Sequence, residues 1–274
     1  MLSVNTNAGA LVALENLNNT SQQLANAQNI VSTGLLVGNA KDNGAIWSIA
    51  QSERSQVSDL DAVKSSLQTG QSIIDVANSA GTTVSNLLTQ MSQKALAASD
   101  SSLNTASRLA LNNDFVALRN QITSTVQNAA FNGVNLLNGS LTKITSLANS
   151  AGTSVLTTLA QNLTLGGGVI TITATTTIST VATAQATITI VNASLNAVDT
   201  ALATLGTSSR ALDTHLNFVS SLQDTLTTGI GNLVNADLAK ESATLQALQT
   251  KQQLGIQALS IANQASTALL GLFR

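Results

Sequence analysis

The absence of proline from all 274 residues is the feature that most constrains the fold of this chain. Proline breaks helices because it lacks a backbone N–H and because its ring clashes with the preceding turn. A chain of this length without proline can form several very long helices, which glycine is then left to interrupt. Apolar residues make up 43% of the sequence, enough to bury a core in one or two domains.

The amino-terminal region carries an apolar seam of helical period. Its members recur every seven residues, with further apolar residues three or four positions on: Ala10, Ala13, Leu14, Leu17, Leu24, Ala27 and Val31. We predict a helix that ends near Gly34 and is followed by an irregular connector over 38–44, which is rich in Gly and Asn.

Two further seams follow. From about residue 58 to residue 98, two interleaved seven-residue series are apolar or glycine throughout, which predicts a long helix in a left-handed supercoil. Its small members, such as Gly70 and Gly81, mark points where a neighbouring backbone approaches closely. The polar run 99–102 offers helix-capping side chains, and the next seam extends from Leu111 to Ala129.

The longest seam runs from Val191 to Ile230, and we expect Gly229 and Gly231 to end its helix. Asp237 is then placed to cap a final helix. Apolar residues of this last helix cover more than one narrow stripe: Leu238, Leu245, Leu248, Leu254, Ile256, Leu259, Ile261, Leu269, Leu270, Leu272 and Phe273.

Between about residues 132 and 187 the helical period gives way to short Thr-rich runs such as Val169–Thr173, preceded by three glycines at 166–168. Such runs favour strands or hairpins over helix. The stretch from Ile144 to Val198 contains no Asp, Glu, Lys or Arg. We therefore predict a small, exposed, β-containing region in the middle of the chain.

The scarcity of charge excludes several classes of function. Charged residues form 9% of the sequence, the net charge is −2 and no basic patch stands out, so nucleic acid is not an expected partner. Cysteine is absent and His215 is the single histidine, which leaves no partners for a His-based metal site or catalytic triad. We predict no catalytic, cofactor-binding or metal-binding residues, and an enzyme is the weakest alternative.

We also predict no membrane insertion, because polar residues interrupt every apolar run before about 18 residues accumulate. The amino terminus lacks the basic stretch and continuous apolar run of a conventional secretory signal. A binder of membrane surfaces is a rival hypothesis, but it requires a basic polar face that these helices lack.

Apolar seams at both ends of the chain predict that the two terminal helices lie side by side. Such helices are marginal alone in water, and broad apolar faces left in solvent invite association. A repeated contact between different faces that does not close into a ring builds a helical filament. We predict an assembly interface that involves Ala10, Leu14, Leu17, Leu24, Val31, Leu238, Leu245, Leu248, Leu254, Leu259, Leu269, Leu272 and Phe273.

Several segments resemble bacterial flagellins over about residues 1–140 and 190–274. The similar segments are Val4–Asn7, Ala40–Ala45, Phe131–Gly139, Ala236–Ser242, Gln252–Leu259, Ile261–Gln264 and Leu270–Arg274. The resemblance implies a mainly α fold with long antiparallel helices, a terminal coiled coil and a small outer region with a β-hairpin. The domains expected are a coiled-coil assembly domain of 1–36 with 234–274, a helical core domain of 37–140 with 182–233, and an outer segment of 141–181.

The resemblance further implies a secreted, extracellular subunit of the flagellar filament that polymerises with itself, alone or mixed with sister flagellins. Its implied partners are the flagellar export apparatus, a secretion chaperone, and the hook-associated and cap proteins. A hook-filament junction protein is the nearest alternative, because it resembles flagellin at both ends. As in many flagellins, O-linked sugars are an option for the middle region, at Thr171, Thr173, Thr175, Thr176 and Thr177.

Overall fold

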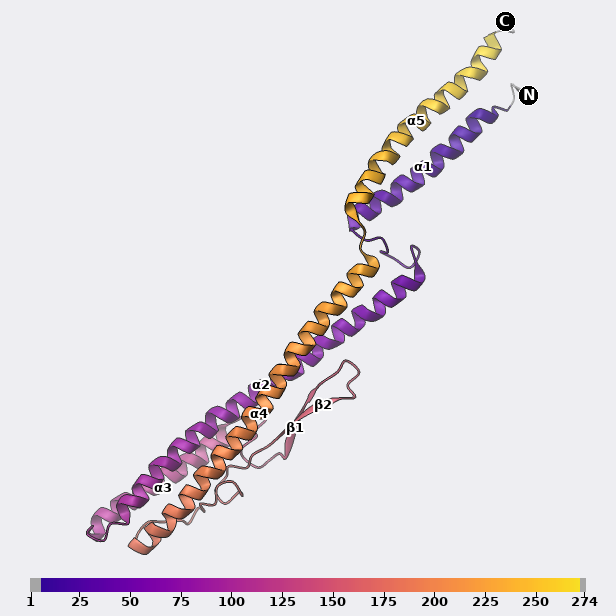
Figure 1. Cartoon of the computed structure of the whole chain (residues 1–274). Helices are drawn as coiled ribbons and strands as arrows, with labels where there is room; N and C mark the ends of the chain where they lie inside the picture. Colours follow the sequence, from indigo (N-terminus) through magenta and orange to yellow (C-terminus); the bar gives the residue numbers. More distant parts are fainter. Residues whose placement is uncertain (1–5, 272–274) are drawn as a thin grey trace. The chain divides into compact units, whose positions relative to one another are not determined.

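The computed structural model describes the backbone of residues 6–271 and the side chains of residues 6–264. Five helices and two strands occur in this part of the chain (Figure 1). Their order is α1 (Ala8–Thr33), α2 (Gly44–Ala98), α3 (Thr105–Asn128), β1 (Lys143–Leu147), β2 (Val155–Leu159), α4 (Val181–Val234) and α5 (Leu238–Gly271). The mainly α fold with a small hairpin, predicted from the sequence, is confirmed.

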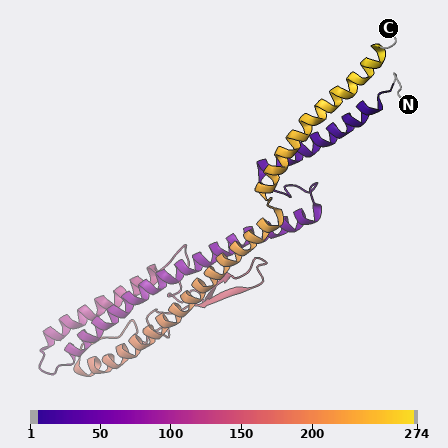
Figure 2. The same cartoon turned by 45° about the horizontal axis from the view of Figure 1, so that its top comes forward.

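The contacts divide the chain into two compact units. We call residues 1–55 with 225–274 the terminal unit, and residues 56–224 the central unit. Within the terminal unit α1 and α5 lie side by side along their length (Figure 1). Within the central unit α3 lies beside α2 (Figure 2), and the hairpin contacts both α2 and α4.

Local chemistry explains where several helices start and stop. Helix α1 ends as predicted before Gly34, which takes a left-handed conformation (φ +73°) and donates its N–H to the Ile30 carbonyl at 2.8 Å. Asp237 caps α5 as predicted, because its Oδ1 accepts the backbone N–H groups of Ala239 at 3.0 Å and Lys240 at 3.1 Å.

Three boundaries differ from the sequence predictions. Helix α2 begins at Gly44 rather than near residue 58, since the Asn43 side chain already accepts the Ile46 N–H at 3.2 Å. The cap of α3 is Asn104, whose side chain accepts the Ser107 N–H at 2.8 Å, rather than a residue of 99–102. Helix α4 continues through Gly229 and Gly231 to Val234; a helical glycine costs only about 1 kcal/mol relative to alanine, and Ile230 and Val234 are buried.

The core of the central unit follows the predicted seams. In α4, buried residues recur every seven positions: Val191, Val198, Leu205, Leu212 and Val219. In α2, the seam is also closed to solvent: Val63, Leu67, Ile74, Ala77, Val84, Leu88, Met91 and Ala95. The small residues lie at tightly packed points, but side chains rather than the expected backbone approach them: a Cβ at Gly81 would lie 2.5 Å from Leu202 Cδ2.

Helix α4 also has the length and composition to cross a membrane, with a mean hydropathy of 1.3 in its most apolar window, a property not expected from the sequence pattern. It is the one such helix among the described residues. Of the most apolar window of α4, 28% is buried, and the buried seven-residue series lies along one face of the helix.

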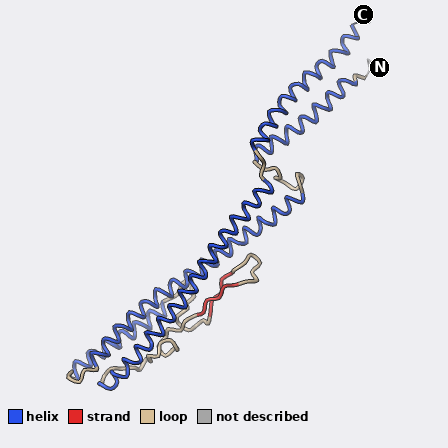
Figure 3. Tube along the Cα trace, viewed as in Figure 1, coloured by secondary structure: helices blue, strands red, loops and turns tan. Residues whose placement is uncertain are grey.

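The strands form one antiparallel hairpin, in which Lys143 pairs with Leu159 and Leu147 with Val155 (Figure 3). The predicted strand at Val169–Thr173 is wrong: this segment is irregular, and only an isolated bridge joins Leu165 to Ile170. Its alternating apolar residues, Ile170 and Ile172, are fully buried instead of forming one face of a sheet. The middle region is therefore less exposed than predicted.

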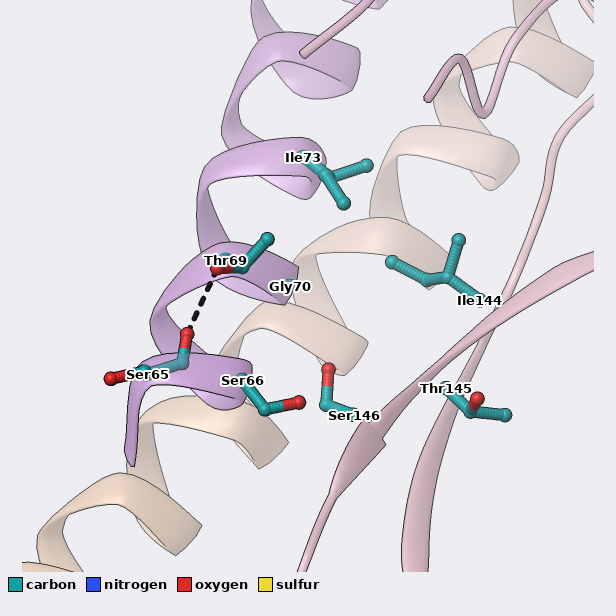
Figure 4. Close-up of a pocket in the computed structure, with 8 residues that line it drawn as sticks. All are labelled: Ser65, Ser66, Thr69, Gly70, Ile73, Ile144, Thr145 and Ser146. Carbon is teal, nitrogen blue, oxygen red and sulfur yellow. Dashed lines mark hydrogen bonds between the residues drawn. The ribbon is translucent and has the colours of Figure 1, made fainter. Parts of the chain in front are cut away.

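The hairpin is attached to the helices on both sides. The hydroxyl of Ser66 on α2 accepts the Leu147 N–H at 3.0 Å, and His215 Nε2 on α4 lies 2.7 Å from the Ala148 carbonyl. Ser146 points from β1 toward Gly70, beside a hollow lined by hydroxyl groups of α2 (Figure 4). A Cβ at Gly70 would collide with Ser146 Oγ, so glycine is what lets β1 approach the helix this closely.

Candidate assembly surface

The α1–α5 pair of the terminal unit has a continuous internal seam. On α5 the half-buried positions recur at steps of three and four residues: Glu241, Leu245, Leu248, Gln252, Gly255, Leu259 and Ala262. On α1 the covered positions follow the same spacing: Ala10, Ala13, Leu17, Thr20, Leu24, Ala27 and Val31. A Cβ at Gly255 would lie 3.3 Å from Leu17 Cδ1, which shows how closely the two helices approach.

Polar contacts link the two helices near the start and near the middle of α1. The side chain of Asn7 caps α1 by accepting the Ala10 N–H at 3.1 Å, and its Nδ2 donates to the Ala262 carbonyl of α5 at 2.7 Å. Gln252 Nε2 lies 3.4 Å from Ser21 Oγ. No ion pair joins α1 to α5 among the described side chains. Apolar packing is therefore the main attraction between these helices.

Beside the seam, large apolar side chains of the same helices remain in solvent. On α1, Leu11 is 62% exposed and Val12 58% exposed. On α5, Leu254 and Ile261 are 58% and 68% exposed, and they lie seven residues apart on one flank of the helix. None of the described side chains of α5 up to residue 264 is fully buried, so the two helices alone do not cover their apolar surface.

The residues predicted for the assembly interface fall into three groups. Seam positions within the pair are occupied by Ala10, Leu17, Leu24, Val31, Leu245, Leu248 and Leu259. Solvent-exposed positions are occupied by Leu14, Leu238 and Leu254. The side chain of Leu269 and the residues Leu272 and Phe273 lie outside the part that the structure describes.

Leu11 and Val12 are exposed apolar residues that the sequence prediction did not include. Leu11 lies on the wall of a hollow of about 500 Å³ between α1 and α5, together with Leu14 and Leu259. The seven-residue rule selects the seam and passes over its flanks. The sequence signal that could have identified Leu11 is its position directly after the seam residue Ala10, which places an apolar side chain on the flank of the helix.

The Thr residues considered for O-linked sugars lie on the irregular segment before α4. Thr171, Thr173 and Thr175 are exposed, whereas Thr176 and Thr177 are half-buried. The hydroxyl of Thr173 lies 3.1 Å from that of Thr175 and 3.0 Å from that of Thr176. The Thr171 hydroxyl is 3.0 Å from Ser194 Oγ, so most of these hydroxyls already have a neighbour.

The titratable side chains are dispersed over the chain. His215 is half-buried, and its ring lies 5.7 Å from that of Phe218, which gives it a packing role beside the hairpin. The described residues contain no group of three or more His, Cys, Asp or Glu that could hold a metal ion. The ion pair found in this part of the chain joins Lys94 to Asp114 at 2.7 Å, at the surface.

These features together define a mainly helical protein whose paired helices α1 and α5 expose large apolar side chains. The comparisons with known proteins give the family. The family model of the bacterial flagellin N-terminal helical region matches residues 4–142, and that of the C-terminal helical region matches residues 188–273. The chain belongs to the bacterial flagellin family.

Two named relatives agree with this assignment. The chain is 56% identical to Flagellin FljM of Caulobacter vibrioides, over 99% of this chain and 98% of the relative. It is 36% identical to a flagellin of Brucella melitensis over the full length of both. A crystal structure of Bacillus cereus flagellin aligns with 55% of this chain and 86% of its own, at 24% identity and a TM-score of 0.49.

The chain is accordingly a structural subunit of the bacterial flagellar filament. Both Caulobacter FljM and the Brucella relative are named flagellins, and neither is named a hook-associated protein, so the alternative of a junction protein has no support. Membership of a structural-protein family is consistent with the expected lack of catalytic activity.

Proposed function

We propose that copies of this chain polymerise through the exposed apolar flanks of the α1–α5 pair. The observation that carries the proposal is the exposure of Leu11, Val12, Leu254 and Ile261 on two helices that are already paired with each other. The predicted residues Leu14 and Leu238 add to the same surface, at 43% and 48% exposure. Covering this area from water requires other molecules.

The low charge of the pair supports burial in a polymer rather than permanent exposure. Between residues 8 and 33, α1 carries Glu15 as its one charged residue. Bringing helices with so few charges together requires little desolvation of ions, so apolar burial is not offset by a large electrostatic cost. At roughly 25 cal/mol per Å², about 500 Å² of apolar contact offers on the order of 10 kcal/mol before ordering costs.

The seam residues act differently from the flank residues in this proposal. Ala10, Leu17, Leu24, Val31, Leu245, Leu248 and Leu259 hold the pair together and so position the flanks. Leu14, Leu238 and Leu254 contact neighbouring copies directly. We assign Leu269, Leu272 and Phe273 to the same interface, because they continue the apolar character of α5 toward its end.

We further propose that the chain is secreted and works outside the cell, after unfolded export through the flagellar export apparatus with a secretion chaperone. Hook-associated and cap proteins would contact the ends of the polymer. The family supports this part of the proposal, and the absence of cysteine agrees with it, because no disulfide would have to be reduced before the chain is threaded through a channel.

Glycosylation of exposed Thr171, Thr173 and Thr175 stays a proposal, which the intact mass of filament-derived protein would test.

The flank assignment is tested by replacing Leu254 and Ile261 together with lysine. We expect a folded, soluble chain that no longer forms filaments, because two ammonium groups would have to be buried in the interface. The measurements are sedimentation and electron microscopy of the polymer, with circular dichroism of the monomer as a check of folding.

The matched control adds the same two charges at the residues directly before Leu254 and Ile261, as Gln253→Lys and Ser260→Lys. Both residues are exposed and have the same seven-residue spacing. We expect this control to polymerise. Filaments of normal yield from the Leu254→Lys, Ile261→Lys variant would contradict the proposal, and so would equal loss of filaments in both variants.

A further inference from the structure

The central unit carries two hollows that differ in charge and in the elements that form them. The Arg210 hollow lies between α4 and β2, measures about 600 Å³, and is lined by Leu156, Thr207, Arg210, Ala211, His215 and Phe218. The Asp75 hollow lies between α2 and α3, measures about 520 Å³, and is lined by Asp75, Val76, Ser79, Ala80, Thr125 and Ala129. They share no residue.

The Arg210 hollow combines a projecting ring with a cation that has no carboxylate partner among the described side chains. Phe218 is 57% exposed, and its ring leans on His215 with the centroids 5.7 Å apart. Arg210 is exposed, and its Nη2 donates to the Thr207 hydroxyl at 3.4 Å. Asp213, the nearest acid on α4, does not line the hollow and forms no ion pair with Arg210 in the described structure.

The Asp75 hollow has small side chains where the Arg210 hollow has a ring, and it carries a negative charge where the other carries a positive one. Its walls are short side chains, with Ser79, Ala80 and Ala129 among them, and these leave room for a large group. Asp75 is exposed and accepts a hydrogen bond from Gln71 Nε2 at 3.1 Å. No lysine or arginine lines this hollow or pairs with Asp75 in the part of the chain that the structure describes.

The two hollows are formed by different elements, the Arg210 hollow by α4 and β2 and the Asp75 hollow by α2 and the end of α3. A contact between the Arg210 hollow of one molecule and the Asp75 hollow of another therefore joins different faces. In a pair of molecules joined in this way, one Arg210 hollow and one Asp75 hollow remain unoccupied. Further copies can bind there, so the contact repeats along a polymer instead of stopping at a dimer.

We propose that the Arg210 hollow of one copy docks on the Asp75 hollow of the next copy in the filament, with the Phe218 ring in the small-residue hollow and the Arg210 guanidinium on the Asp75 carboxylate. The proposal rests on polymerisation of this chain, and adds a contact of the central unit to that of the terminal unit. The occupant is a second copy because the two hollows carry charges of opposite sign, Arg210 in one and Asp75 in the other, in a chain with only 9% charged residues.

The ring and the ion pair have different tasks in this contact. The ring supplies apolar burial, which is not directional. An ion pair of partly exposed groups adds little affinity, but a like-charge arrangement is strongly disfavoured, so the pair selects the register between copies. Charge reversal is for this reason a more sensitive test than charge removal.

The test uses Arg210→Asp, Asp75→Arg and the double variant, each in the full chain. We expect each single reversal to raise the critical concentration for polymerisation by on the order of tenfold, since like charges then face each other. The double variant exchanges the charges and is expected to return to within about threefold of the unmodified chain. Sedimentation of polymer over a concentration series gives the critical concentration.

Matched controls place the same changes of charge elsewhere on the central unit. Lys143 and Asp59 are exposed and line neither hollow, so Lys143→Asp and Asp59→Arg are expected to polymerise normally. For the ring, Phe218→Ala should raise the critical concentration, whereas Leu109→Ala, which shortens a similarly exposed side chain at 54%, should not.

Lack of rescue in the double variant overturns the pairing of these two residues. Normal polymerisation of both single variants overturns it as well. The outcome is separable from the proposal for the terminal unit: if Leu254→Lys with Ile261→Lys abolishes filaments while charge reversal has no effect, the α1–α5 surface stands and the docking of the two hollows fails.

Discussion

Glycine sets the distance between helices and hairpin at single positions of the central unit. Gly70 is buried between β1 and α4, where a Cβ would meet Ser146 Oγ and would lie 3.3 Å from Leu212 Cδ1. Gly206, by contrast, lies within α4, and a Cβ added there would have no neighbouring atom within 4 Å. A methyl group added at Gly70 should therefore destabilise the fold, whereas one added at Gly206 should stabilise it.

We predict that Gly70→Ala lowers the free energy of unfolding by about 1–2 kcal/mol, because Ser146 must move within a closely packed site. Gly206→Ala should raise it by up to about 1 kcal/mol, since alanine is the better helix former where space is free. Urea unfolding followed by circular dichroism measures both. Equal effects of the two substitutions would show that packing at Gly70 is not limiting.

At the scale of elements, the helices were predictable because two independent signals agree along the sequence. The seven-residue seams identify the buried faces, and Gly34 and Asp237 mark boundaries through their preferred conformations and capping bonds. At the end of α4 glycine was the one signal of a boundary, and the predicted boundary was wrong. Glycine did not end α4 at Gly229, because burial of Ile230 and Val234 outweighs its low helix propensity.

The irregular segment around Ile170 shows a second limit of sequence reasoning. Alternation of Ile170 and Ile172 with threonine is typical of a strand, but a strand also needs a partner for its backbone. Here the Gly166 N–H contacts the carbonyls of Ile170 and Ile172, and the Ser194 hydroxyl accepts the Thr171 N–H at 3.1 Å. Tertiary contacts of this kind leave no local pattern in the sequence.

The attachment of the hairpin leads to a prediction for amide exchange. Ser66→Ala removes the acceptor of the Leu147 N–H, so exchange at Leu147 should accelerate by on the order of fivefold to tenfold, equivalent to about 1 kcal/mol for a single hydrogen bond. Exchange within α2 should not change. Ser65→Ala is the control, because this neighbouring side chain is exposed. Unchanged protection at Leu147 would mean that other contacts hold the hairpin on α2.

At the scale of the whole molecule, the two units differ in how fully they bury their own apolar side chains. The central unit buries its seams internally, including the seven-residue series of α4. The terminal unit leaves every described side chain of α5 at least partly open. The sequence seams predicted which helices pair, but not which flanks stay exposed, because exposure depends on how the two helices turn toward each other.

Removal of residues 255–274 tests whether the end of α5 is needed for assembly but not for folding of the central unit. The deletion takes away the end of α5, together with the contacts of Gly255 to Leu17 and of the Ala262 carbonyl to Asn7. We expect a soluble chain that does not polymerise and whose first turns of α1 exchange their amides rapidly, because a lone helix end is marginal in water. The central unit should keep its urea midpoint, since its core contains none of the deleted residues. Filaments formed by the shortened chain at the normal critical concentration would count against assembly through α5, whereas loss of the central unit's cooperative unfolding would show that the two units depend on each other for folding.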